Sequence, residues 1–314
     1  MLSLKNNLQI ESWRKILVNK HALAYIYAIE HDASPTILTS VQKASINIFC
    51  NDLDTINRLY PNFINYDDIS LSRLKAVFPL IGGNSAAHKY NLITPLNTDA
   101  AFRLTYHGAV APTHSALGIY TNGLSGYVNT HFNPSISSVQ FKTSMGFYSG
   151  TNVSSTSSCM GNYVGVGGMT LLPNNAGTAS TTQYVGVGST ASGIVTDSLG
   201  FYLTSRIANN NLKLYKNGIT LGSQLTIINT ALSSYTICIG AAPNIGNFWA
   251  GYCQFSFIGA DLSDPEATMF SLAVNRLQKN LGNGRIFFLT DDDVWLSDND
   301  GSVLTDEDGI TLMI

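Results

Sequence analysis

The acidic side chains of this 314-residue sequence are unevenly distributed, and their distribution bears directly on catalysis. No glutamate occurs between Glu30 and Glu266. Between Asp99 and Asp261, the single acidic residue is Asp197. Hydrolysis of a glycosidic bond normally uses two carboxyl groups that face each other across the substrate. Calcium-dependent sugar binding likewise needs several hard oxygen ligands. The middle of the sequence therefore lacks the acids for either chemistry.

The acids are concentrated instead near the C-terminus. From Ile286 onward there are eight acidic and no basic side chains, whereas the preceding residues carry 17 basic and 12 acidic ones. A calcium loop of the EF-hand type places acids at alternate positions before a glycine, and SDNDGSVLTDEDG does not keep that register. We therefore expect no metal there, although cation binding by these acids stays an alternative.

The acidic segment is better explained as a strand–turn repeat. Three clusters recur at spacings of seven and eight residues, namely Thr290-Asp291-x-Asp293, Ser297-Asp298-x-Asp300 and Thr305-Asp306-x-Asp308. The intervening strands span about four residues and cannot bury an apolar face within one chain. We therefore expect the tail to associate with copies of itself, a trimer being favoured over a dimer, with a disordered acidic tail as the alternative. The predicted interface residues are Trp295, Leu296, Leu304, Leu312, Met313 and Ile314.

Histidines offer a second kind of chemistry. His107, His114 and His131 could meet a serine and Asp197, or hold zinc together. Serines are too abundant for the first coincidence to carry weight, and the three histidines lack the local spacing of a zinc site. Surface or hydrogen-bonded structural histidines are the simpler interpretation. We predict no catalytic residue, metal or cofactor.

Metal-free sugar binding remains open to this sequence. Such sites use amide hydrogen bonds and stacking on aromatic rings. Candidate residues near predicted loops are Tyr120, Asn122, Tyr127, Asn247 and Trp249. The alternative is that these aromatic side chains belong to the core or to an interface.

Residues 1–85 have helical patterns and are predicted to form a helical adaptor or anchor, with a cap on the next domain as the alternative. Ser34 and Pro35 favour a helix start, followed by an apolar face of Ile37, Val41, Ala44 and Ile48. Two further helices are predicted over residues 52–60 and 67–78. Gly82 to Ser85 has the composition of a linker.

Residues 86–285 favour a different architecture, because short β-branched and aromatic runs alternate with Gly, Ser, Thr and Asn. Asn217-Gly218 predicts a type I′ hairpin. The pattern indicates an antiparallel β-sandwich of the jelly-roll type. A closing helix is expected from Asp264 to Gly282. Its buried stripe is predicted to hold Met269, Phe270, Ala273, Val274, Leu277 and Leu281. Residues 286–314 form the third segment, the oligomerisation tail.

The overall composition indicates the cellular compartment and the classes of partner to expect for this chain. Charged residues make up 12% of it, about half the usual share for a soluble domain. The start lacks a secretory signal, and no run approaches the roughly 18 apolar residues of a membrane span. The scattered basic residues do not favour nucleic acid. Four cysteines without a CxxC pair are expected to be buried free thiols, which suits the cytoplasm.

Four runs occur in this order along the chain: PLIGGNSAAHKYNLITPLNTDAAFRLTYHG, TNGLSGYVNTHFNPS, KLYKNG and FSFIGADLSDPEATMFSLAVNRLQKNLG. Together they resemble virion proteins of tailed bacteriophages that carry a concanavalin-A-like (laminin-G-like) jelly roll. The resemblance covers roughly Leu74 to Gly282, and short acidic C-terminal repeats like TDEDG also occur in such proteins. It implies a component of the virion, such as a head fibre, tail fibre or decoration protein, assembled in the host cytoplasm. It also implies contacts with other virion proteins through residues 1–85, and it supplies no catalytic residue.

The tail interpretation predicts the mass of the free protein. Because its short strands need neighbours, the full chain should be an oligomer in dilute solution. Light scattering or sedimentation measures the mass directly. A stable, well-folded monomer with an ordered tail would contradict the prediction.

Overall fold

The computed structural model describes residues 19–139, 141–162, 167–183, 190–224, 230–242 and 246–283. The predicted tail and its interface residues therefore lie outside the described residues. Among those described, no helix combines the length and apolarity needed to cross a bilayer. The helices are α2 (Lys20–Glu30), α3 (Ser40–Leu59), α4 (Ser85–His88), α5 (Pro134–Ser137), α6 (Asp264–Asn280) and the 3-10 helix η1 (Asp99–Ala101).

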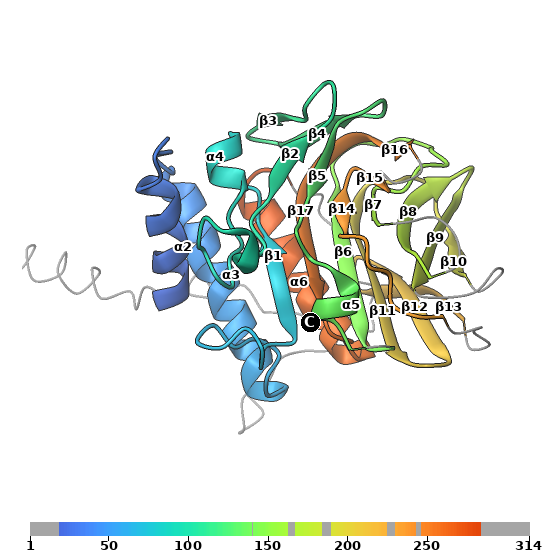
Figure 1. Cartoon of the computed structure of the whole chain (residues 1–314). Coiled ribbons are helices and arrows are strands. Elements are labelled where there is room, and N and C mark those ends of the chain that lie inside the picture. The colour runs from blue at the N-terminus through green and yellow to red at the C-terminus, as the bar shows by residue number, and fades with distance from the viewer. Residues whose placement is uncertain are drawn as a thin grey trace, which may run out of the picture.

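The strands form two stacked antiparallel sheets, which confirms the predicted β-sandwich (Figure 1). The central strand of the larger, eight-stranded sheet is β17 (Ala250–Gly259), which pairs with β6 along one edge and with β4 and β1 along the other. Across this sheet the strands follow the order β13 (Ile219–Gln224), β12 (Asn211–Lys216), β11 (Gly200–Ala208), β6 (Thr143–Ser149), β17, β4 (Gly118–Asn122) and β3 (Thr113–Ser115). The eighth strand, β1 (Leu74–Phe78), pairs with β17.

The second sheet covers one face of the first. Its order is β10 (Ala191–Ile194), β9 (Thr178–Gln183), β8 (Met169–Asn175), β7 (Met160–Gly161), β14 (Cys238–Ile239), β5 (Tyr127–Asn129) and β2 (Thr105–His107). A separate small ribbon joins β15 (Ala241–Ala242) and β16 (Asn247–Phe248). In the hairpin between β12 and β13, Asn217 and Gly218 have φ values of 53° and 87°, which confirms the predicted turn residues with positive φ.

The eight-stranded sheet is buried on both faces. All seven residues of β6 are buried. Along β11, Tyr202 belongs to the core between the sheets, whereas Phe201 and Leu203 pack on the opposite side, under the helices. This alternation follows from the two-residue period of a strand. The four cysteines are buried free thiols, as predicted from the sequence: Cys50, Cys159, Cys238 and Cys253.

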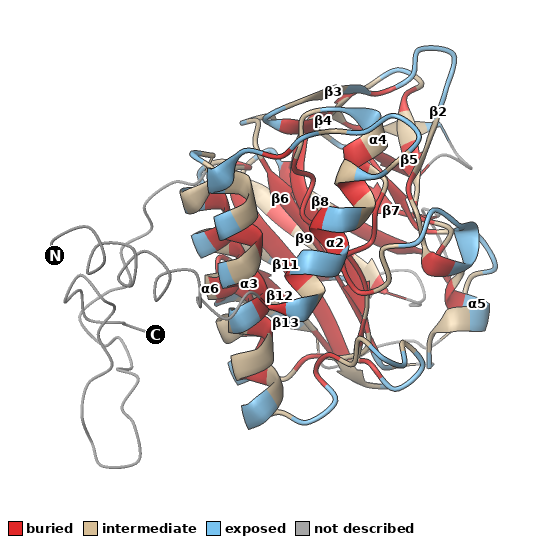
Figure 2. Cartoon of the chain, turned by 90° about the vertical axis from the view of Figure 1, so that its left-hand side faces the viewer, coloured by how far each residue is buried: buried red, intermediate tan, exposed pale blue. Residues whose placement is uncertain are grey.

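A layer of helices covers the outer face of this sheet, with the buried sides of α3 and α6 turned toward it (Figure 2). Phe270 of α6 lies at the centre of the contact. Its ring meets the rings of five other phenylalanines, with centroid separations between 4.7 and 6.4 Å: Phe49, Phe63, Phe201, Phe255 and Phe257. The helical segment and the sandwich therefore share one hydrophobic cluster.

The predicted start and buried face of the first helix are wrong. Thr39 is the N-cap of α3. Its hydroxyl accepts a hydrogen bond from the Gln42 amide, and the Gln42 side chain accepts one from the Thr39 amide, which together form a capping box. Ser34 instead belongs to a turn in which its amide donates to Asp32. The buried side of α3 is made by Ile46, Phe49, Cys50, Leu53 and Ile56, so the predicted face points outward. The helix predicted over residues 52–60 is the second half of α3.

The helix predicted over residues 67–78 is also wrong. Asp68 accepts hydrogen bonds from the amide and the hydroxyl of Ser70, which closes a turn. Residues Leu74–Phe78 then form β1, which hydrogen-bonds to β17. Arg73, expected to favour a helix C-terminus, makes an ion pair with Glu266 of α6. Pairing with a distant strand therefore overrode the local pattern.

The closing helix agrees closely with the sequence. Phe270, Ala273, Val274 and Leu277 are buried, and Met269 and Leu281 are partly buried. Gly282 has a φ of 78° just after the helix, as expected at its end. The cap is one residue earlier than predicted, because Ser263 forms a capping box with Glu266 and Asp264 is already helical.

Removing the ring of Phe270 should destabilise the fold severely. Phe270→Ala deletes a fully buried side chain at the contact between helices and sheet, and such changes cost about 3–5 kcal/mol of unfolding free energy. Urea unfolding measures the loss. Met269→Ala on the same helix, where the side chain is only partly buried, is the matched control and should cost less. Equal losses would show that Phe270 has no central role.

Candidate functional site

An uncharged groove lies on the eight-stranded sheet beside the C-terminal end of α6. Its volume is about 480 Å³. We call it the Tyr252 groove, and its described lining residues are Leu117, Tyr148, Ser149, Gly150, Thr151, Asn152, Leu199, Gly200, Tyr252, Gln254, Gly282 and Asn283. Phenol, hydroxyl and amide groups thus line it, without an acidic or basic side chain among these residues.

On β17, the aromatic side chain that lines the groove is Tyr252, which packs against a neighbour on the adjacent strand β4. Tyr252 on β17 is opposite Tyr120 on β4, and their ring centroids are 5.0 Å apart. The Tyr252 amide donates to the Thr151 hydroxyl at 3.0 Å, and the Gly150 amide donates to the Tyr252 carbonyl at 2.9 Å. A Cβ atom at Gly150 would lie 2.6 Å from Cδ of Gln254, so glycine there makes room for the Gln254 amide. These contacts fix the groove at the end of the sheet.

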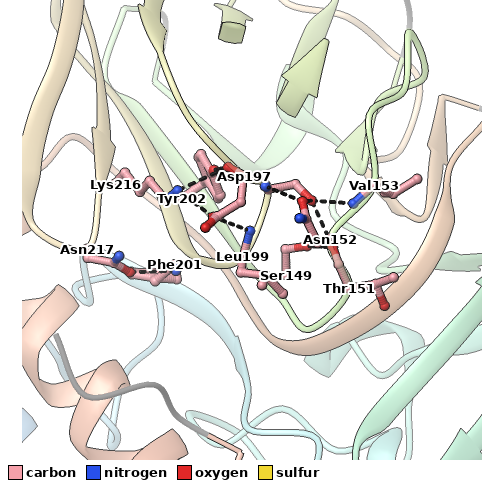
Figure 3. A network of polar contacts seen from close by, with 11 residues as sticks. Ser149, Thr151, Asn152, Val153, Asp197, Leu199, Phe201, Tyr202, Lys216 and Asn217 are labelled. Atoms are coloured by element: carbon pink, nitrogen blue, oxygen red, sulfur yellow. Dashed lines mark hydrogen bonds and ion pairs between the residues drawn. The ribbon is translucent and has the colours of Figure 1, made fainter. Parts of the chain in front are cut away.

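A polar network joins the two loops that line the groove beside Tyr252 (Figure 3). The Ser198 hydroxyl donates to the Thr151 carbonyl at 2.8 Å and accepts from the Val153 amide at 2.7 Å. The Ser198 amide donates to Oδ1 of Asn152 at 3.1 Å. The loop after β6 and the loop before β11 are therefore tied together, and both line the groove.

Asp197, the single acid between Asp99 and Asp261, holds the loop before β11 in place. Its carboxylate accepts from Nζ of Lys216 at 2.9 Å and from the Leu199 amide at 3.0 Å (Figure 3). Its carbonyl accepts from the Tyr202 hydroxyl at 2.8 Å and from Lys216 at 3.1 Å. A carboxylate bonded in this way holds two strands and a loop in place.

The five sugar-site candidates from the sequence do not form one site. Tyr120 packs against Tyr252 but is not itself among the residues that line the groove. Tyr127 lies on the other sheet, where its ring stacks on His107 at 5.2 Å. Asn122 accepts hydrogen bonds from the amides of residues 124–126 and so closes a hairpin loop.

The other two candidates have structural positions. Asn247 accepts a hydrogen bond from the Ser158 amide through Oδ1. Trp249 is only 1% exposed and packs edge-on against Phe147 in the core. Trp249 therefore has no ring face for a ligand, and the core alternative is the right one for it.

Tyr252 and Gln254 were missed by sequence reasoning. The signal was present in the strand AGYCQFSFIG, where the two side chains alternate with buried Cys253. What the sequence does not show is that β4 pairs with this strand and brings Tyr120 beside Tyr252.

A second groove of similar size is lined by three basic side chains, those of Arg73, Lys75 and Lys142. It lies between residues 69–75 and 136–142 and has a volume of about 490 Å³. Arg73 pairs there with Glu266, and Lys75 donates to the carbonyls of Ile69 and Ser70 at 2.7 and 2.9 Å. Two of the three basic side chains are thus engaged within the chain, so this groove is the weaker candidate.

The three histidines considered for catalysis or zinc do not converge. His107 and His131 both contact the Thr105 hydroxyl through Nε2, at 2.8 and 2.9 Å. His114 instead faces His88, with their Nδ1 atoms 3.0 Å apart. Within the described part of the chain, no three His, Cys, Asp or Glu side chains gather as metal ligands. The hypothesis of a site formed by the three histidines is therefore wrong.

Comparison with known proteins gives no family. No family model matches this chain, and no curated protein matches it. Among solved structures, it is similar to domain 4 of AbnA, a GH43 extracellular arabinanase from Geobacillus stearothermophilus, in complex with arabinotriose. The TM-score is 0.43 and the identity 14%, covering 63% of this chain and 98% of that one.

Two larger proteins are similar over part of their length. The botulinum neurotoxin serotype D binding domain has a TM-score of 0.41 and 14% identity, covering 65% of this chain and 51% of that one. Trypanosoma rangeli sialidase has a TM-score of 0.43 and 10% identity, covering 77% of this chain and 39% of that one. The chain thus spans about half of the first protein and about two fifths of the second. At these scores the likenesses carry no argument about function.

The pair formed by buried His88 and half-buried His114 predicts a pH-dependent stability. Burial lowers the pKa of His88 to about 3 and that of His114 to about 4. Both groups have an ordinary pKa near 6.5 when unfolded, so their contribution is complete above that pH and is lost as pH falls toward 4. Replacing both by leucine should therefore flatten the fall in stability between pH 6.5 and 4. Urea unfolding across this range measures it, with exposed His107→Gln as the control. An unchanged slope in the double variant would contradict the prediction.

Proposed function

We propose that this chain is a structural component of a tailed-bacteriophage particle, either a head fibre, a tail fibre or a decoration protein. In this proposal its sandwich binds an uncharged glycan of the host surface in the Tyr252 groove. The observation that carries the binding role is the lining of the groove by phenol, hydroxyl and amide groups without a charged side chain. The role in the particle is supported by the sequence motifs and by the acidic tail, which predicts self-association.

The chemistry of the groove suits a neutral sugar. A sugar ring has C–H faces that pack on aromatic rings, and its hydroxyls both donate and accept hydrogen bonds. Tyr252, against which Tyr120 packs, supplies the ring, and Gln254, Asn152 and Thr151 line the same groove. A charged ligand would find no counter-ion among these side chains.

A dedicated receptor-recognition protein is the second candidate function, and the same groove would serve it. A polysaccharide-degrading enzyme is favoured less. Hydrolysis normally uses a pair of carboxyl groups at the sugar, whereas Asp197 is held by Lys216 and by a backbone amide. The engagement of this carboxylate supports a binding role over a hydrolytic one.

The binding role is tested by a glycan array, followed by calorimetry on the sugars retained. Tyr252→Ala should weaken binding roughly tenfold, since an aromatic contact contributes about 0.5–1.5 kcal/mol beyond its buried area. Tyr127→Ala removes the same side chain from the other sheet and should leave affinity unchanged. The two variants thus distinguish sugar binding in the Tyr252 groove from sugar binding on the second sheet, where the candidate Tyr127 lies.

Two results would count against the proposal. If the unmodified protein retains no sugar at millimolar concentration, the sandwich is not a glycan-binding domain. If Tyr127→Ala weakens binding and Tyr252→Ala does not, the sugar binds on the other sheet. The role in the particle is tested separately, by labelling purified particles with an antibody against this chain.

A further inference from the structure

A bulge in β17 directs Gln254 to the outer face of the eight-stranded sheet. The pairing of β17 with β6 shifts register between Cys253 and Phe255, so that Gln254 is the extra residue. Cys253 packs in the core between the sheets, whereas Phe255 packs on the opposite side, under the helices. Gln254 lines the Tyr252 groove beside the end of α6. The bulge therefore places the neighbours Gln254 and Phe255 on one face, which the two-residue period of a regular strand does not do.

The carboxamide of Gln254 has no hydrogen-bond partner among the described residues. Gln254 is 6% exposed, and the bond from Nε2 of Gln278 ends on its backbone carbonyl, not on its side chain. The carboxamide thus offers one acceptor atom and two donor hydrogens. Buried polar groups nearly always have a partner, and leaving one without a bond costs stability. A molecule in the groove is therefore expected to bond to this carboxamide.

Neighbouring polar groups of the groove are used within the chain. The Ser149 hydroxyl donates to the Thr151 carbonyl at 3.1 Å, and the Thr151 hydroxyl accepts from the Tyr252 amide at 3.0 Å. Oδ1 of Asn152 accepts from a backbone amide of the loop before β11 at 3.1 Å. These bonds hold the walls of the groove. The carboxamide of Gln254 differs from them because it offers both a donor and an acceptor to a ligand.

Gly150 provides the space for this carboxamide. A Cβ atom at Gly150 would lie 2.6 Å from Cδ and 2.9 Å from Oε1 of Gln254. The φ of Gly150 lies outside the left-handed region, so its backbone conformation does not itself require glycine. A larger side chain at this position would therefore displace the carboxamide, while the loop could keep its conformation.

We propose that Gln254 recognises two hydroxyl groups on neighbouring carbons of a neutral sugar, one donating to Oε1 and the other accepting from Nε2. Tyr252 lies two residues earlier, about 6.6 Å along the strand, so a sugar ring packed on the tyrosine can turn its edge to the carboxamide. Each sugar hydroxyl both donates and accepts, so a neighbouring pair satisfies both carboxamide atoms at once. This inference rests on the proposed glycan binding and specifies which feature of the sugar is selected.

Calorimetry with the methyl α-glycosides of glucose, mannose and galactose tests this role. These probes are neutral, and between them they present neighbouring hydroxyls in cis and trans arrangements. Gln254→Met keeps the length of the side chain and removes both hydrogen-bonding atoms, so it should weaken the best-bound of the three roughly tenfold. Gln224→Met makes the same change on β13, away from the groove, and should leave affinity unchanged. The Tm of Gln254→Met should not fall, because no bond within the described chain is lost.

Monodeoxy derivatives of the same glycoside distinguish direct recognition from an indirect effect. For the unmodified protein, removing either hydroxyl of the recognised pair should weaken binding roughly tenfold. In Gln254→Met the same deletions should cost little more, because the bonds are already lost and the effects of contacting groups are not additive. Gly150→Ala should also weaken binding of the parent glycoside, since the new Cβ displaces the carboxamide.

The failure of this inference can be told from the failure of the proposed function. A blank glycan array overturns both. Sugars retained on the array, together with equal affinity in Gln254→Met or no binding of any of the three glycosides at millimolar concentration, overturn the role of Gln254 alone. Hydroxyl deletions that cost as much in Gln254→Met as in the unmodified protein would also overturn it. A fall in the Tm of Gln254→Met would do the same, because it would assign the carboxamide a structural partner.

Discussion

The packing of Phe270 against five other phenylalanine rings joins α6, α3, the segment before β1 and the eight-stranded sheet. A sheet whose strands are apolar on both faces must be covered on both faces, because exposed strands of this kind would leave a large apolar area in water. The second sheet covers one face, and the helices cover the other. The helical segment is therefore part of the hydrophobic core of this protein, whatever else it contacts.

The covering of the eight-stranded sheet also determines which part of its outer face stays open to a ligand. The helices occupy most of the outer face, but α6 ends at Asn280, and the sheet continues beyond it to Tyr120 and Tyr252. Two loops close the space at this end, and Ser198 ties them to each other. The groove is thus made from backbone bonds and neutral side chains, which suits recognition of a neutral molecule more than acid–base chemistry.

Charged groups have supporting roles in this architecture. Asp197 and Lys216 hold the loop before β11, and Arg73 and Glu266 join β1 to the capped start of α6. Burial alone would raise the pKa of Glu266, but its bonds to Arg73 and Ser263 hold that pKa below the ordinary value. Removing one partner of such a pair leaves the other charge poorly solvated, so these pairs specify geometry more than they add stability.

The sequence by itself determined the β-sandwich, the Asn217-Gly218 hairpin, the closing helix and the scarcity of carboxylates, because each depends on local pattern or composition. Tertiary structure decided the rest. Within residues 37–56, two sets of apolar residues have helical spacing in the sequence, and the set that contains Phe49 packs against Phe270 in the core. Residues 74–78 became a strand because β17 had an edge to pair. Tyr252 lines the groove because the loop of residues 150–152 hydrogen-bonds to its backbone, whereas Trp249 packs in the core against Phe147. Such choices depend on partners distant in sequence, and no local spacing encodes them.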